Sequence, residues 1–400
     1  MKANKTPSIR LKDYQGDWQE HTYSDYYSRY DERNKGQFPV ERTLSVATMS
    51  INKNGNGASN SSLGNYKVLR IGDIAFEGHR NKEHRYGRFI LNDNIDGIIS
   101  PRFTALRPVA EQDYSFWKYY IHDENVMRKK LVKCTKAGTM MNELEIDSFL
   151  SQTVYVPEIA EQSDVGAYLQ HLDGLILLHH QKHQKLSQAK LSFLRSSFAN
   201  LDDAVPLSRF GGFTAEWKKQ TLDKIIKPYT DYLPTPTDGY TRLGIRSHMK
   251  GTFYEYVAPS KQLGEKRLQR VKRDNFIVNI VFAWEHAIAV TTEEDEGKLV
   301  SHRFPQFSFN EGMYPRFFHY ALNDERFRHH LWLASPSGAG RNKTLRIDEM
   351  MEYELRVPEY EEQKKIADFL TSLDELIELY DYRITKLQNI KAACLQGMFV

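Results

Sequence analysis

The last third of this chain repeats a segment that occurs earlier, at a fixed distance of 201 residues. From Val156 to Phe198, 16 of 43 positions are identical to those 201 residues later, without a gap. Unrelated segments of ordinary composition would share about three. Earlier positions recur too: Tyr119 returns as Tyr320 at the same distance, and Arg10 returns as Arg209 at a distance of 199. The sequence therefore predicts one unit of about 200 residues used twice, with an internal pseudo-twofold relation.

Each copy of this unit ends in a long amphipathic helix of about 40 residues. Its apolar residues are spaced alternately by four and three, which is typical of a coiled-coil seam. Two such seams in one chain can cover each other, most simply as an antiparallel pair; pairing with another protein is the alternative. His179 and His183 lie on the seam, where polar residues commonly fix register. The predicted pairing residues are Leu169, Leu172, Ile176 and Leu186 in the first copy, and Leu370, Leu373, Ile377 and Leu387 in the second.

The part of each copy before the helix is predicted to be globular and mixed. Residues 66–76 have the pattern of strand, Gly-Asp turn and strand. Phe116 to Lys133 and Phe317 to Leu333 are each predicted to form an amphipathic helix. The predicted fold class is mixed α/β (α+β), with two globular domains separated by two long antiparallel coiled-coil helices. The predicted boundaries are 1–155 and 201–356 for the globular domains, and 156–200 and 357–400 for the helical regions.

Composition limits the possible partners and the compartment. Lys and Arg total 55 against 52 acidic residues, a net charge of +3, so any binding of a polyanion must be local. Two cysteines offer no disulfide framework, which favours a reduced cytosolic protein. The longest strongly apolar stretch, Phe276 to Trp284, is too short to cross a bilayer. We therefore expect a soluble, cytoplasmic protein that does not bind a membrane.

Signals of catalysis are scarce in this sequence. Residues 337–344 faintly resemble a phosphate-binding loop, but Asn342 stands where that loop needs the glycine before its lysine. His179, His180 and His183 have helical spacing, but no carboxylate or cysteine completes a set of metal ligands. The paired carboxylates Asp123 and Glu124 are predicted to lie on a solvated helix face. No catalytic residue, metal site or bound cofactor is predicted.

Basic and amide-rich segments in the two globular parts are better candidates for function. Arg and Lys neutralise DNA phosphates and recognise guanine edges, and Asn recognises adenine edges. A solubilising surface is the alternative for any one cluster, but their presence in both copies favours double-stranded DNA. The candidate DNA-binding residues are Lys53, Asn54, Asn56, Arg80, Lys82, Arg85, Lys136, Arg246, Lys250, Lys266, Arg267, Arg270, Arg341, Asn342 and Lys343.

Motifs at the start and end of each copy resemble those of the DNA-specificity subunits of type I restriction–modification systems. The second copy opens with Pro206-Leu-Ser-Arg209-Phe210-Gly-Gly-Phe213-Thr-Ala-Glu-Trp217, and the first with a matching Pro7 to Trp18 segment in which Leu11 and Tyr14 replace phenylalanines. The helices open with Pro157-Glu-Ile-Ala-Glu161-Gln162 and Pro358-Glu-Tyr-Glu-Glu362-Gln363. The resemblance covers nearly the whole chain.

The resemblance implies a non-catalytic recognition subunit. Two target-recognition domains would each bind one half of a split, asymmetric DNA sequence, and the helices would set the gap between the halves, near one turn of B-DNA or about 34 Å. The same helices would dock two methyltransferase subunits, through which restriction subunits join. S-adenosylmethionine, ATP and Mg²⁺ would bind those partners. The alternatives are a DNA-modifying enzyme with recognition domains, which lacks its catalytic motifs here, and a coiled-coil scaffold, which leaves the basic loops unexplained.

Overall fold

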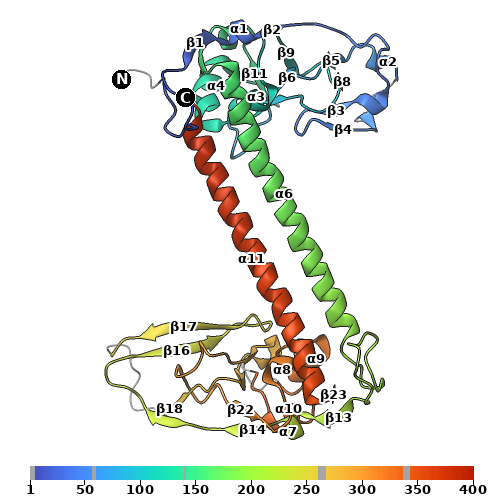
Figure 1. Ribbon diagram of the computed structural model, residues 1–400, viewed down its shortest axis with the longest axis vertical. Helices are drawn as coiled ribbons and strands as arrows, with labels where there is room; N and C mark the ends of the chain where they lie inside the picture. The colour runs from blue at the N-terminus through green and yellow to red at the C-terminus, as the bar shows by residue number, and fades with distance from the viewer. Residues whose placement is uncertain (1–4, 56–59, 139–140, 260–266, 337–342) are drawn as a thin grey trace. The chain divides into compact units, whose positions relative to one another are not determined.

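The computed structural model describes residues 5–55, 60–138, 141–259, 267–336 and 343–400 (Figure 1). The chain divides into two compact units, the first of residues 1–181 and 380–400 and the second of residues 182–379. Two long helices, α6 (Ile159–Ser196) and α11 (Tyr360–Met398), run through both units. Each unit therefore combines one globular part with a segment of each long helix, whereas the boundaries predicted from the sequence assign each helix to a segment of its own.

The globular part of the first unit is built on a four-stranded antiparallel sheet in the order β2-β9-β6-β7. A separate antiparallel pair, β1 and β12, leads directly into α6. The remaining strands form the pairs β5–β8, β3–β4 and β10–β11. The bounds are β1 (Gln19–Thr22), β2 (Tyr27–Arg29), β3 (Leu44–Ser45), β4 (Ser50–Ile51), β5 (Lys67–Leu69), β6 (Ile74–Glu77), β7 (Arg88–Leu91), β8 (Gly97–Ile99), β9 (Thr104–Pro108), β10 (Thr135–Ala137), β11 (Asn142–Leu144) and β12 (Thr153–Val156).

The second unit has the same arrangement in its main sheet, β14-β22-β19-β20, and in the pair β13–β23 that leads into α11. It differs in a five-stranded sheet, β15-β18-β21-β16-β17, where the first unit has short pairs joined by single bridges. The bounds are β13 (Lys218–Thr221), β14 (Ile226–Tyr229), β15 (Tyr232–Pro234), β16 (Tyr240–Ile245), β17 (Thr252–Val257), β18 (Arg267–Arg270), β19 (Asn275–Val278), β20 (Ile288–Val290), β21 (Leu299–Val300), β22 (Gln306–Phe309) and β23 (Glu354–Val357).

In each unit two short helices follow the main sheet where the sequence predicted a single helix. The predicted helix over 116–133 is divided into α3 (Tyr114–Tyr120) and α4 (Glu124–Cys134), because Asp123 caps α4 by accepting a hydrogen bond from the Val126 amide. Asp123 is buried, so its assignment to a solvated face was wrong. Asp324 divides the predicted helix over 317–333 in the same way. The other short helices are α1 (Tyr23–Tyr26), η1 (Val40–Arg42), α2 (Asn60–Leu63), α5 (Ile146–Leu150), α7 (Leu222–Ile225), η4 (Ala283–Glu285), α8 (Pro315–Ala321), α9 (Glu325–Leu333) and α10 (Ile347–Met351).

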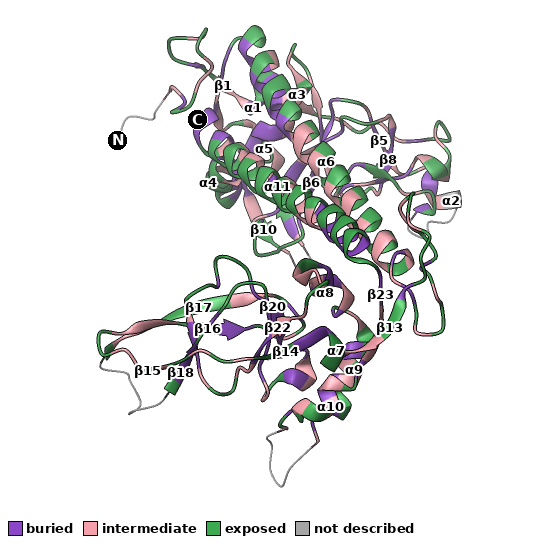
Figure 2. Ribbon diagram, turned by 60° about the horizontal axis from the view of Figure 1, so that its bottom comes forward, coloured by how far each residue is buried: buried purple, intermediate pink, exposed green. Residues whose placement is uncertain are grey.

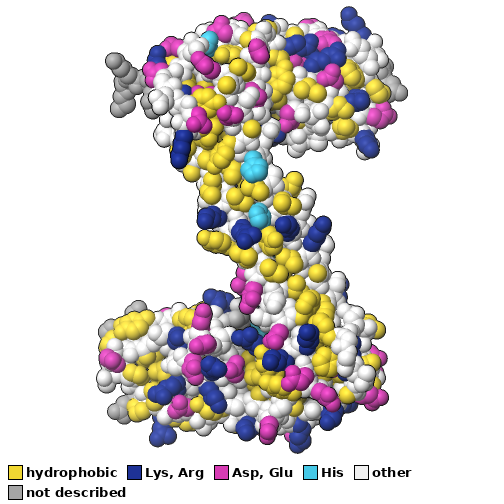
Figure 3. Space-filling view, viewed as in Figure 1, with side chains coloured by type: hydrophobic (Ala, Val, Ile, Leu, Met, Phe, Trp, Pro, Cys, Tyr) yellow, Lys and Arg dark blue, Asp and Glu magenta, His cyan; other side chains and the backbone are white. Residues whose placement is uncertain are grey.

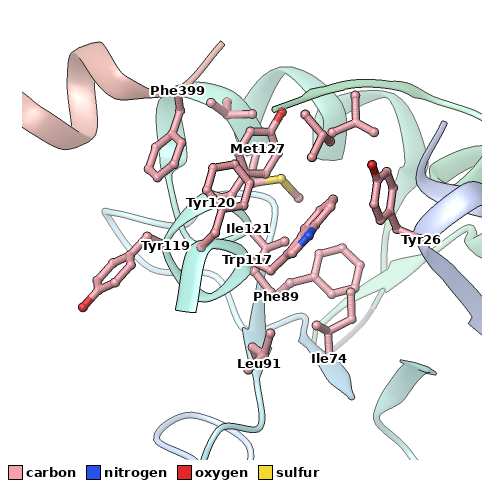
Figure 4. Close-up of a cluster of buried hydrophobic side chains, with 14 of the residues drawn as sticks. Tyr26, Ile74, Phe89, Leu91, Trp117, Tyr119, Tyr120, Ile121, Met127 and Phe399 are labelled. Atoms are coloured by element: carbon pink, nitrogen blue, oxygen red, sulfur yellow. The ribbon is translucent and has the colours of Figure 1, made fainter. Parts of the chain in front are cut away.

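Each unit has a large aromatic core where a short helix packs between the sheet and the long helices, and Figure 4 shows the core of the first unit. In the first unit, Trp117 and Tyr120 of α3 meet Leu169 of α6 and Phe399 near the carboxyl end of the chain. The second core is formed in the same way by α8 with α11 and the carboxyl end of α6. These cores fix the globular part of each unit onto the long helices.

The segments of α6 and α11 in each unit lie side by side and run in opposite directions. In the first unit the rings of His179 and Tyr380 are 5.3 Å apart, and in the second those of Phe193 and Phe369 are 4.6 Å apart. All eight predicted pairing residues are buried or half-buried, and such positions alternate with exposed ones along both helices (Figure 2). Among the described helices, none is long and apolar enough to cross a membrane.

Candidate nucleic-acid interface

The motifs at the start of each copy meet the motifs that open the long helices. In the first unit the Arg10 guanidinium donates two hydrogen bonds of 2.7 Å to the Glu161 carboxylate, which also accepts one of 3.3 Å from the Trp18 indole. The bond to Glu161 raises the pKa of Arg10 further above its ordinary value. Arg209, Glu362 and Trp217 make the same contacts in the second unit, at 2.7, 2.7 and 3.2 Å. We call each group of three the anchor of its unit.

A second polar group joins both long helices to the globular part of each unit. The Tyr119 hydroxyl of α3 donates to the Asp173 carboxylate of α6 at 2.7 Å, and the Lys391 ammonium of α11 donates to the same carboxylate at 2.6 Å. Tyr320, Asp374 and Lys190 form the equivalent group in the second unit. We call each group a clasp. It fixes the register of α6 against α11, because the aspartate and the lysine come from different long helices.

Three loops converge beside the sheet of the first unit and form the first loop cluster, which consists of the turn 45–50, the β6–β7 loop 78–87, and residues 135–138 and 141–144. The Asn142 amide donates to the Gly78 carbonyl at 2.8 Å, and the Arg80 guanidinium donates to the Gly138 carbonyl at 3.0 Å. The Arg88 guanidinium reaches the turn, donating to the Ala47 carbonyl at 3.2 Å. This cluster brings together four of the predicted DNA-binding residues, all exposed: Arg80, Lys82, Arg85 and Lys136.

The equivalent loops of the second unit form the second loop cluster, which consists of the turn 246–251, the β19–β20 loop 279–287 and residues 343–346. The Leu345 amide donates to the Ile280 carbonyl at 2.9 Å, as Asn142 does to Gly78. The Lys343 ammonium lies 5.0 Å from the ring centroid of Trp284 and 5.0 Å from that of Trp332. The predicted residues brought together here are Arg246, Lys250 and Lys343.

The other predicted residues lie elsewhere or cannot be placed. Lys53 and Asn54 follow β4, at the opposite end of the β3–β4 hairpin from its turn. Arg267 and Arg270 lie on β18, three positions apart and so on opposite faces of the five-stranded sheet. Four predicted residues, Asn56, Lys266, Arg341 and Asn342, lie outside the described residues, as does most of the loop 337–344 that faintly resembles a phosphate-binding loop.

The charges in the two clusters differ in how far they are already neutralised. Lys136 forms an ion pair with Glu145, and Arg270 lies 3.8 Å from Asp231. Among the residues that the structure describes, eight of the predicted cations form no ion pair, and five of these are exposed in the loop clusters: Arg80, Lys82, Arg85, Arg246 and Lys250. These five are the best placed to neutralise an external anion, because no carboxylate competes for them.

Sequence reasoning missed the clasps and the aromatic pair around Lys343. The heptad pattern does not predict that Lys190 pairs with Asp374 and Lys391 with Asp173. The available signal was that all three members of a clasp recur at a distance of 201 residues. The partners of Lys343 lie 59 and 11 positions earlier in the chain, a separation that gives no sequence signal.

Comparison with known proteins agrees with this geometry. Residues 246–389 match the family model described as "Type I restriction modification DNA specificity domain". This segment is similar to the DNA-specificity domain of type I restriction–modification systems. That domain covers the turn 246–251, the remaining described loops of the second cluster, and α11 as far as residue 389.

Relatives of the specificity domain match most of the chain. The type I restriction enzyme MjaVIII specificity subunit of Methanocaldococcus jannaschii is 22% identical over 268 residues, which are 63% of this chain and 62% of that protein. The match thus spans less than two thirds of the curated relative. The crystal structure of the HsdS subunit from Thermoanaerobacter tengcongensis is 13% identical, with a TM-score of 0.50 and coverage of 96% of both chains. That of the S subunit of a type I system from M. genitalium is 14% identical, with a TM-score of 0.52 and coverage of 99% of both. At these identities the two structures establish a shared fold.

Proposed function

We propose that this chain is the DNA-specificity subunit of a type I restriction–modification complex and that it recognises a bipartite, asymmetric DNA sequence. The observation that carries the proposal is that the anchors and clasps are the same in both units, whereas the loop clusters differ in sequence. Identical supports would hold two different recognition surfaces in equivalent positions. A split asymmetric target needs that combination, since its two halves differ in sequence.

The two loop clusters are the proposed DNA-contacting surfaces. Arg80, Lys82 and Arg85 in the first cluster, with Arg246 and Lys250 in the second, are exposed and form no ion pair among the described residues. Such cations neutralise phosphates and release condensed counterions, which gives binding that weakens as salt rises. Additional contacts are proposed for the other predicted residues, which are Lys53, Asn54, Lys136, Arg267 and Arg270, with the four that lie outside the described residues.

The two long helices are the proposed frame and ruler. We infer that α6 and α11 form an antiparallel coiled coil related by an internal pseudo-twofold axis, because the clasps exchange the aspartate and the lysine between the helices at equivalent positions. The length of that pair would then set the gap between the two half-sites. Fixed register is what such a ruler requires, and the clasps supply it.

The exposed apolar side chains of the long helices are the proposed docking surface for methyltransferase subunits, through which restriction subunits would join. Leu177 is 59% exposed on α6 and Tyr382 is 64% exposed on α11, and hydrophobic side chains remain at the surface along both helices (Figure 3). Apolar side chains that a helix pair leaves in water favour a protein partner. On this proposal the chain has no chemistry of its own, and S-adenosylmethionine, ATP and Mg²⁺ bind the partner subunits.

The proposal is tested by selecting bound sequences from a randomised DNA library with the full chain and its methyltransferase partner. The wild-type complex should enrich two different short sequences at a fixed spacing. Changing Arg80, Lys82 and Arg85 to Gln should weaken binding and make it less sensitive to salt, since each lost phosphate contact lowers the salt slope by about 0.9. The matched control, Lys12→Gln in the exposed amino-terminal segment, should leave both properties unchanged. Enrichment of a single continuous sequence, or of none, would contradict the proposal.

A separate experiment tests the ruler. One heptad inserted into both α6 and α11 keeps the seam in phase, because seven residues are two turns of the supercoiled helix. The spacing between the enriched half-sites should then increase while the half-sites themselves stay the same. An unchanged spacing would refute the ruler and leave the recognition function standing.

A further inference from the structure

The turn that closes one hairpin in each loop cluster has an unusual backbone. Met49 in the β3–β4 turn has φ of 49°, and Met249 in the β16–β17 turn has φ of 50°. This left-handed region favours glycine, and for a long side chain it costs free energy that the surrounding structure must offset. Both methionines are buried, at 2% and 6% exposure. The same strained residue thus occupies equivalent turns, 200 positions apart in the sequence.

Neighbouring loops hold both turns in this conformation. In the second unit the amides of His248 and Met249 donate to the carbonyls of Glu285 and His286, at 2.8 and 2.9 Å. In the first unit the Met49 amide donates to the Ser45 carbonyl at 2.7 Å, and the Met49 carbonyl accepts from the Asn94 side chain at 3.0 Å. The turns are therefore rigid parts of their loop clusters, since several independent bonds fix each one.

Burying the central methionine turns the residues on both sides of it outward. Thr48 and Ser50 are exposed in the first unit, and His248 and Lys250 are exposed in the second. The hydroxyls of Thr48 and Ser50 lie 2.6 Å apart and point to the same surface. Both turns share the left-handed methionine, although His248 is also left-handed, with φ of 60°, and Thr48 is not. The exposed pairs carry different hydrogen-bonding groups: two hydroxyls in one turn, an imidazole and an ammonium in the other.

We propose that these two turns are base-reading elements, with Thr48 and Ser50 reading one half-site and His248 and Lys250 reading the other. The inference rests on the proposed DNA-recognition function and names its specificity-determining residues. The Lys250 ammonium suits the O6 and N7 acceptors of guanine in the major groove, and the hydroxyl pair can donate to and accept from base edges. Strain at the methionines serves this role by presenting the flanking side chains from a fixed position.

Changes confined to one turn at a time, made in the full chain with its methyltransferase partner, test the proposal in the same library selection. Lys250→Met should lower the enrichment of guanine at one position of one half-site by at least 5-fold and leave the other half-site unchanged. The pair Thr48→Val with Ser50→Ala should alter the preferred base in the opposite half-site alone. Matched controls are Lys227→Met on β14 and Ser28→Ala on β2, which lie on the edge strands of the main sheets away from the turns. Thermal unfolding of each variant checks that the fold is retained.

The outcomes separate this inference from the function on which it rests. If the wild-type complex enriches no bipartite sequence, the proposed function itself fails. If the wild type does enrich one but Lys250→Met weakens binding equally on all sequences, Lys250 contacts phosphate and the inference is wrong. It is also wrong if both turn variants keep the wild-type sequence and affinity, because the turns would then be structural.

Discussion

The contribution of the anchors to stability can be tested quantitatively, and Glu161→Gln is the most informative substitution. The Glu161 side chain is 4% exposed and that of its partner Arg10 is 14% exposed. The change keeps the shape of the side chain but leaves the buried guanidinium without its counter-charge. Removing one partner of a buried ion pair costs about 3–5 kcal/mol, mostly because the remaining charge is uncompensated. We therefore expect the free energy of unfolding of the first unit to fall by an amount in that range.

Urea denaturation of the full chain, followed by tryptophan fluorescence, measures this loss. With a slope of about 2 kcal/mol per M for a unit of this size, the midpoint should fall by about 1.5–2.5 M. Glu362→Gln should have the same effect on the second unit, because its contacts with Arg209 and Trp217 are the same. The control Glu20→Gln removes an exposed ion pair with Lys5 and should leave the midpoint unchanged.

A double variant separates lost charge from lost packing. Replacing both members of the ion pair, Arg10→Met with Glu161→Leu, leaves no uncompensated charge. The double variant should therefore lose less free energy of unfolding than Glu161→Gln alone, apart from about 1 kcal/mol for the Trp18 indole that loses its acceptor. A change below 0.5 kcal/mol for Glu161→Gln would refute the reasoning. So would a double variant whose cost equals the sum of the two single changes.

Four further substitutions test how the long helices and α8 are packed. Gly174→Ala should stabilise the chain by about 1 kcal/mol in thermal unfolding, since nothing lies within 4 Å of the added methyl. Gly166→Ala should destabilise the chain, because the added methyl would lie 2.0 Å from the Ser115 hydroxyl. Asp173→Asn should lower the free energy of unfolding by about 1 kcal/mol in a urea titration, because it weakens a half-exposed clasp. No loss would mean that the clasp does not contribute to stability. Burial lowers the pKa of His319, so the unfolded state binds the proton more tightly than the folded state does. The free energy of unfolding should therefore fall as the pH drops below about 6.5. In unfolding measured between pH 7 and 5, His319→Gln should make stability depend less on pH.

The frame was largely predictable from the sequence because its signals are periodic. Heptad spacing predicted both long helices, and the repeat predicted that they occur in pairs. Periodicity does not say which polar groups pair, so the partners of Lys190 and Lys391 were missed. It also concealed the break before Glu124, because the apolar pattern continues across a cap that depends on the single side chain of Asp123.

The composition of the two loop clusters was only partly predictable from the sequence. Basic residues marked both loop clusters, but convergence of the three loops depends on the strand order of the sheet, which brings Gly78 to Asn142. Arg267 and Arg270 looked equivalent to Arg246 in sequence, yet the strand geometry places them away from the turn. Burial of Met249 between two exposed residues follows from its left-handed backbone, which no pattern of residue types revealed.

The bonds that hold the anchors, the clasps and the loop clusters explain why the anchors and clasps are the same in both units while the loop clusters differ. The anchors and clasps depend on particular side chains, so a substitution in Glu161 or Asp173 removes a specific bond. The second loop cluster is joined mainly through the backbone, as between Leu345 and Ile280, and the first combines the backbone bond between Asn142 and Gly78 with side-chain bonds to carbonyl groups. Backbone bonds persist when side chains change, because every residue except proline carries the same amide and carbonyl. Surface side chains of the turns can therefore be exchanged without disturbing the backbone bonds that support them.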